Sequence, residues 1–151
     1  NGKSPQAGSA CVLSCINILA EIREQDIVLL DDKKLILYEY MQNLNLSGQP
    51  GLGDYFMKWV WSMQANPEYC QQVTITPLDS DPKDFLEFPR DPELTDFDRS
   101  DRKFVAVALS SPKSPYILNA VDSDWANHFE VLSRRGIRIK FLCPQHVNSG
   151  R

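Results

Sequence analysis

Three carboxylates near the end of the chain could bind a divalent metal ion. Asp122 directly follows the apolar run 116–121, and Asp124 comes two residues later. Ligands of an open parallel sheet bind outside the carboxyl ends of its strands, so an acid that ends a buried strand favours a functional role. Asp124 either reaches the same space or caps the next helix. Asp101 opens an earlier helix, where it either binds the ion or stabilises the first helical turn through the helix dipole.

Glu39 is the fourth candidate. It lies in a predicted helix whose apolar stripe is Leu35, Ile36, Tyr40 and Leu44. This stripe places Glu39 near a buried edge of the helix. An unpaired carboxylate there is costly, so we expect a cationic partner or a metal ion beside it.

The elements that must position these residues alternate between helix and strand. We predict helices at 10–24, from a cap at Asp31 or Asp32 to 44, at 54–64 with Asp54 as cap, at 100–110 with Ser100 as cap, and at 124–135, ended by Gly136. We predict strands at 27–30, 73–75, 116–121 and 137–142, a loop at 48–53 and a long irregular connection at 77–98. Buried strands that alternate with helices indicate one α/β domain over 1–151, with a mostly parallel sheet between two helical layers.

Composition limits the possible partners. The formal net charge of -4 argues against a surface that binds nucleic acid mainly through phosphates, but not against an enzyme that holds its substrate through a metal and a local basic strip. Lys3, Arg102 and Lys103 are candidates for that strip, or they lie on a solvated surface. No run approaches the roughly 20 apolar residues of a membrane span, so we expect no membrane partner. Four cysteines without a dense framework predict reduced, buried thiols and a cytoplasmic location.

Three of these acidic segments together resemble the PIN-domain family. Glu39 in Ile-Leu-Tyr-Glu-Tyr is similar to its second acidic motif, and Asp101 before Val-Ala-Val-Ala is similar to its third. The segment 117–125, Ile-Leu-Asn-Ala-Val-Asp-Ser-Asp-Trp, resembles the fourth, and 136–142 resembles the last strand. The family's first motif, a strand that ends in Asp, has no counterpart here, and we expect it to precede Asn1 in the native protein.

The resemblance implies a PIN-like fold and a function. It implies a Mg²⁺- or Mn²⁺-dependent ribonuclease in which Glu39, Asp101, Asp122 and Asp124 hold the ion. It further implies RNA as substrate, an antitoxin protein as a partner if the chain is a toxin, and a homodimer. A PIN-like module that binds nucleic acid or protein without catalysis is the alternative, and a hydrolase of small phosphorylated substrates is a third.

Other patterns have a chemical and a plain interpretation. Cys11, Cys15, Cys143 and His146 either form a zinc site or are packing residues. The glycine-rich segment 48–53 is either a phosphate loop or a turn. His128 is either a general base or a surface or capping residue. The aromatic residues Phe56, Trp59 and Trp61 belong either to the core or to a dimer surface.

Overall fold

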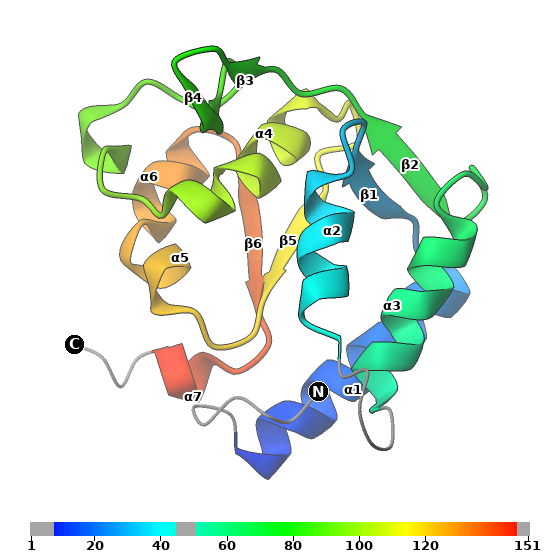
Figure 1. The fold of residues 1–151 in the computed structure, drawn as a ribbon. Helices are drawn as coiled ribbons and strands as arrows, with labels where there is room; N and C mark the ends of the chain where they lie inside the picture. Colours follow the sequence, from blue (N-terminus) through cyan, green and yellow to red (C-terminus); the bar gives the residue numbers. More distant parts are fainter. Residues whose placement is uncertain (1–7, 45–50, 148–151) are drawn as a thin grey trace. The chain divides into compact units, whose positions relative to one another are not determined.

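The computed structural model describes residues 8–44 and 51–147 (Figure 1). The chain is a mixed α/β protein that divides into two compact units, Asn1–Val73 and Thr74–Arg151. Lys3 and residues 48–50 of the predicted glycine-rich loop lie outside the described residues. The assignment of 1–151 to a single domain stays a prediction.

The described part of the first unit contains one parallel strand pair and three helices. Its elements are α1 (Ser9–Gln25), β1 (Val28–Asp31), α2 (Leu35–Gln42), α3 (Leu52–Met63) and β2 (Cys70–Val73). The strands pair in parallel from Val28 opposite Cys70 to Asp31 opposite Val73. Helix α2 packs on β1, and α3 packs against α1 and α2. The predicted helices and the strand at 27–30 are confirmed within two or three residues, whereas β2 ends where the predicted strand 73–75 begins.

Two aspartates at helix starts satisfy backbone N–H groups. Asp31 is buried, and its two carboxylate oxygens accept from the N–H groups of Leu35 and Ile36, each at 2.9 Å. These groups have no partner inside α2, so the Asp31 carboxylate satisfies the start of the helix, although the N-cap position is Lys34. Asp54 is not the N-cap of α3 but its third residue, and its carboxylate accepts from the N–H of Gly51 at 2.6 Å.

The second unit joins a hairpin to a second parallel strand pair. Its elements are β3 (Pro77–Leu78), β4 (Asp81–Phe85), the 3₁₀ turns η1 (Pro92–Leu94) and η2 (Arg99–Asp101), α4 (Arg102–Ser110), β5 (Tyr116–Asn119), α5 (Ser123–Asn127), α6 (Phe129–Arg134), β6 (Arg138–Phe141) and α7 (Pro144–Val147). Strands β5 and β6 pair in parallel over their full length (Figure 1). Helix α4 packs on β4 and β5, and α6 packs on β6.

Three details of the second unit correct the sequence predictions. The segment 77–98 is not irregular throughout, because it contains the antiparallel β3–β4 hairpin and the turn η1. The predicted helix 124–135 is two helices that meet at His128. Ser100 does not cap a helix; the carboxylate of Asp98 accepts from the N–H of Ser100 at 2.8 Å and caps η2 instead.

Candidate functional site

The acidic turn after β5 is held by its own side chains. Asn119, the buried last residue of β5, donates from Nδ2 to the backbone oxygen of Asp122 at 2.7 Å and accepts from the Asp122 N–H at 3.1 Å. The carboxylate of Asp122 accepts from the N–H of Asp124 at 2.9 Å, which makes Asp122 the N-cap of α5. The side chain of Asp122 therefore leaves the carboxyl end of a parallel strand in a fixed turn and is exposed.

Asp124 is held by contacts from two directions. Its Oδ2 accepts from the backbone N–H of Asp98 at 2.9 Å, and its Oδ1 lies 3.1 Å from Nδ1 of His128. Asp98 is 26 residues earlier in the chain, so this hydrogen bond ties the approach to α4 to the turn after β5. The capping role considered for Asp124 belongs to Asp122 instead.

His128 lies between two carboxylates. Its Nε2 is 3.0 Å from Oδ1 of Asp96, and its Nδ1 is 2.9 Å from the backbone oxygen of Asp124. The ring is buried and meets the ring of Phe97 edge-on at a centroid distance of 5.3 Å. Burial lowers the pKa of His128, but the hydrogen bonds to Asp96 and Asp124 and the charges of these two carboxylates outweigh it and raise the pKa.

Asp101 is the last residue of η2 and stands directly before α4. It is half-buried and makes no side-chain cap bond to α4. Asp98 caps the turn that leads to Asp101, and hydrogen bonds from Ser100 lower the pKa of the Asp98 carboxyl. Because the N–H of Asp98 is bound to Asp124, the start of α4 is anchored to the acidic turn.

Glu39 lies in the first unit, in the middle of α2. Its side chain is half-buried, as the apolar stripe predicted, and its backbone oxygen accepts from Nδ2 of Asn43 at 2.9 Å.

The carboxylates of the second unit suit a hard cation, although three of them do not converge. In the described part of that unit, Asp101, Asp122 and Asp124 do not form a group of three whose ligand atoms lie within 4.8 Å of one another. Asp122 and Asp124 share one turn, and each oxygen that accepts one hydrogen bond keeps a second lone pair. Mg²⁺ and Mn²⁺ bind through few carboxylates and keep several waters, and an ion held by this pair stays a prediction.

The two basic residues beside Asp101 point inward. Arg102 is buried: its guanidinium lies 3.1 Å from the Asp84 carboxylate, donates to the backbone oxygen of Thr95 and stacks over the ring of Phe88. Lys103 is buried as well and donates to the backbone oxygen of Ser100. These contacts hold the second unit together, and the predicted contact of Arg102 and Lys103 with substrate phosphate stays a prediction.

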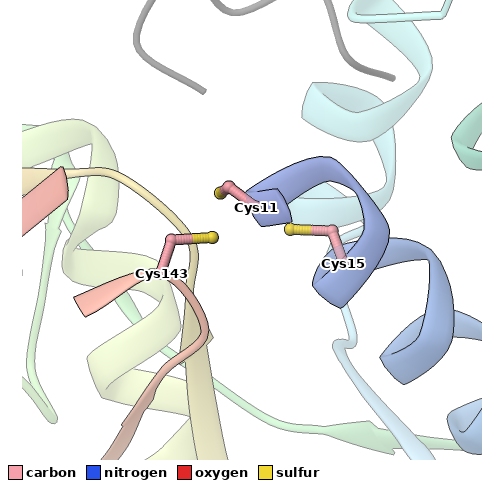
Figure 2. A group of neighbouring side chains, drawn as sticks. All are labelled: Cys11, Cys15 and Cys143. Carbon is pink, nitrogen blue, oxygen red and sulfur yellow. The ribbon is translucent and has the colours of Figure 1, made fainter. Parts of the chain in front are cut away.

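The cysteines differ in chemical state. Cys15 and Cys70 are free thiols, and burial raises the pKa of both. Figure 2 shows Cys11 and Cys15 on neighbouring turns of α1, and Cys143 just beyond β6. Cys11 and Cys143 are each disulfide-bonded, so the prediction of reduced thiols is wrong for these two. Zinc binds cysteine as the thiolate, and this oxidised state does not fit the zinc site considered above.

Sequence reasoning missed Asp96 and Asp98 as neighbours of the acidic turn. The four-residue spacing of Asp124 and His128 was a usable signal, because residues at i and i+4 share one face of a helix. Asp96 and Asp98 gave no such signal, since they come from a turn-rich segment and reach the acidic turn through the fold.

Comparisons with known proteins found no family model, no curated protein and no solved structure that matches the chain. Within residues 8–44 and 51–147, no helix is both long enough and apolar enough to cross a membrane.

Proposed function

We propose that this protein is a Mg²⁺- or Mn²⁺-dependent endoribonuclease with a PIN-like, three-layer α/β/α fold. The observation that carries the proposal is the hydrogen bond from the Asp98 N–H to the Asp124 carboxylate. It anchors the segment that begins α4 with Asp101 to the turn that holds Asp122 and Asp124. This hydrogen bond supports the proposal because it ties two acidic segments of the resemblance together beyond the carboxyl end of β5, where parallel sheets bind their ligands.

The residues would share the work as follows. Asp122, Asp124 and Asp101 would hold the ion, and the resemblance adds Glu39 to this set. An ion held there would supply a water of lowered pKa and would stabilise charge on a phosphodiester. Asn119 and the Asp122 cap fix the turn, so the two carboxylates of the turn are positioned before the ion arrives. Such positioning lowers the cost of ordering the site when the ion binds.

The decisive test is Mn²⁺-dependent cleavage of end-labelled single-stranded RNA by the whole chain. We expect Asp122→Asn and Asp101→Asn each to lower the cleavage rate at least about 100-fold, a loss of roughly 3 kcal/mol of transition-state stabilisation. Asn is as good an N-cap as Asp, so Asp122→Asn keeps the α5 cap while it removes the charge.

Asp79→Asn is the matched control, because Asp79 is an exposed acid of the β3–β4 turn. We expect this variant to cleave as the wild type does. Full activity of both site variants would overturn the proposal.

A PIN-like binding module without catalysis is the second candidate. The specific observation in its favour is that both carboxylates already stabilise the fold. The Asp122 carboxylate caps α5, and the Asp124 carboxylate accepts a hydrogen bond from the Asp98 N–H. Binding of RNA, of an antitoxin protein or of a second copy of this chain, without Mn²⁺-dependent cleavage, would support this candidate over the nuclease.

A further inference from the structure

The parallel strands β5 and β6 expose one face of their sheet. Successive residues of a strand point to opposite faces, so residues two apart share a face. The register pairs Tyr116 with Arg138, and Leu118 and Lys140 pair on the same face two residues farther along. All four side chains are exposed, with 55% of Tyr116 and 36% of Leu118 accessible, whereas the alternate residues of both strands are buried or half-buried. We call these four residues the Tyr116 face.

The Tyr116 face carries a preformed stack of an aromatic ring and a guanidinium group. Cζ of Arg138 lies over the Tyr116 ring, 3.7 Å from its centroid. Nη1 of Arg138 also donates to the backbone oxygen of Ser114 at 2.9 Å, which fixes the guanidinium on the ring. Arginine has five N–H donors, so this bond leaves others for a ligand. Unpaired bases stack on aromatic rings and on guanidinium planes, and this exposed pair offers both.

The charge of this face complements phosphate groups. The segments 111–121 and 135–143 contain no Asp or Glu, although the formal net charge of the chain is -4. Within the part of the chain that the structure describes, neither Arg138 nor Lys140 forms an ion pair with a carboxylate. Their positive charges are therefore available to an anionic partner. A symmetric dimer through this face would bring the cations of both copies into one interface, which like-charge repulsion disfavours.

We propose that the Tyr116 face binds single-stranded RNA, with one base stacked on the Tyr116–Arg138 pair and with phosphates contacted by Arg138 and Lys140. The choice of RNA rests on the proposed function, and the inference adds the surface that holds the strand. Leu118 lies four residues before Asp122, so β5 leads from this face to the acidic turn. Two cations and one aromatic ring suit a short unpaired segment, because a base inside a duplex cannot stack on a side chain.

The test is binding of fluorescently labelled single-stranded RNA to the full chain, measured by anisotropy in EDTA so that no metal-dependent cleavage occurs. Tyr116→Ala removes the ring, and we expect it to lower RNA affinity at least about fivefold. Tyr116→Phe keeps the ring and should bind within about twofold of the wild type. Tyr55→Ala is the matched control, because Tyr55 on α3 is exposed to 54%, and it should bind RNA as the wild type does.

A second pair of variants tests the phosphate contacts. Lys140→Gln removes one exposed charge, and it should lower the magnitude of the slope of log affinity against log salt by about 0.7. Lys83→Gln makes the same change at an exposed position of β4 and should leave the slope unchanged. Equal slopes for Lys140→Gln and the wild type would remove the phosphate contact from the inference.

Three further results would overturn the RNA face. The first is unchanged RNA affinity in a Tyr116→Ala variant whose circular dichroism shows that it is folded. The second is an affinity for fully paired RNA equal to that for the single strand, because stacking requires an unpaired base. The third is a wild type that binds no RNA but forms a dimer that Tyr116→Ala dissociates, which would assign the face to a second copy of the chain.

Two results separate this inference from the proposed function. If the wild type binds RNA in EDTA and the variants behave as expected, but no Mn²⁺-dependent cleavage occurs, the nuclease fails and the RNA face stands. If Asp122→Asn abolishes Mn²⁺-dependent cleavage while Tyr116→Ala leaves RNA affinity unchanged, only the RNA face fails.

Discussion

Asp84 shows how one carboxylate of the hairpin organises the second unit. It is buried, and its Oδ2 lies 2.7 Å from Nη1 of Arg90 and 3.1 Å from Nη1 of Arg102. Burial raises the pKa of Asp84, but the hydrogen bonds from Arg90, from the Phe85 N–H and from Arg102 outweigh it and hold the pKa below its ordinary value. Its ionised form is therefore favoured in the folded protein.

This preference predicts a pH dependence of stability. A carboxyl whose pKa is lower in the folded than in the unfolded state contributes stability above the unfolded pKa, about 4, and loses it as the pH falls through the folded pKa. Asp84→Asn should lower the free energy of unfolding at neutral pH and make it fall less steeply below about pH 4. Urea unfolding at a series of pH values measures this, with Asp79→Asn as the exposed control. Parallel curves for Asp84→Asn and wild type would contradict the prediction.

At the scale of elements, the sequence predicted those that depend on local pattern. The helix α1 follows from apolar residues at helical spacing, and β5 follows from a β-branched and aromatic run. The hairpin was missed because Asp81, Pro82 and Lys83 of β4 are poor strand formers. This segment is stabilised by contacts from outside the strand, above all by the ion pairs of Asp84 with Arg90 and Arg102. A sequence window cannot contain such contacts.

In the candidate site, too, the contacts within one segment were predictable and those between distant segments were not. The placement of Asp122 after a strand was predictable, since one segment contains both the strand and the acid, although β5 ends at Asn119 and not at Val121. The contacts of Asp96 and Asp98 were not, because the Asp96 carboxylate contacts His128 and the Asp98 N–H donates to Asp124 from a segment about 30 residues earlier. The break at His128 was also unpredictable, since the segment 124–135 carries no glycine or proline to signal it.

Gly136 ends α6 in a way that a substitution can test. Its φ is +90°, and the N–H groups of Gly136 and Ile137 donate to the oxygens of Ser133 and Leu132, each at 3.0 Å. This is the Schellman pattern, in which a left-handed residue closes the helix. A Cβ at position 136 would meet no atom within 4 Å, so only backbone strain opposes a side chain there.

Gly136→Ala should therefore lower the free energy of unfolding by about 1 kcal/mol. Thermal or urea unfolding followed by circular dichroism measures the change. Ser133→Ala, at an exposed position of the same helix, is the control and should change stability by less than about 0.5 kcal/mol. An unchanged stability in Gly136→Ala would show that the left-handed conformation is not required at this position.

At the scale of the whole molecule, acidic residues neutralise much of the positive charge of the second unit. Arginines at four positions pair with carboxylates of the segment 77–98: Arg90 with Asp84, Arg99 with Asp81, Arg134 with Glu93 and Arg135 with Asp91. Arg102 and Lys103 point inward, and the formal net charge of the chain is -4. These four paired arginines are therefore less able to neutralise RNA phosphates. If the chain binds RNA, we then expect a reduced share of the affinity to come from contacts with phosphates.

This charge balance predicts a shallow salt dependence of RNA binding. Each neutralised phosphate of a single strand adds about 0.7 to the magnitude of the slope of log affinity against log salt. We expect about two such contacts, for which affinity should fall less than about tenfold between roughly 50 and 200 mM KCl. Fluorescence anisotropy with labelled single-stranded RNA measures this, in the Asp122→Asn variant so that the RNA is not cleaved. A loss of about 1000-fold would require six or more phosphate contacts and a basic surface that the paired arginines do not provide.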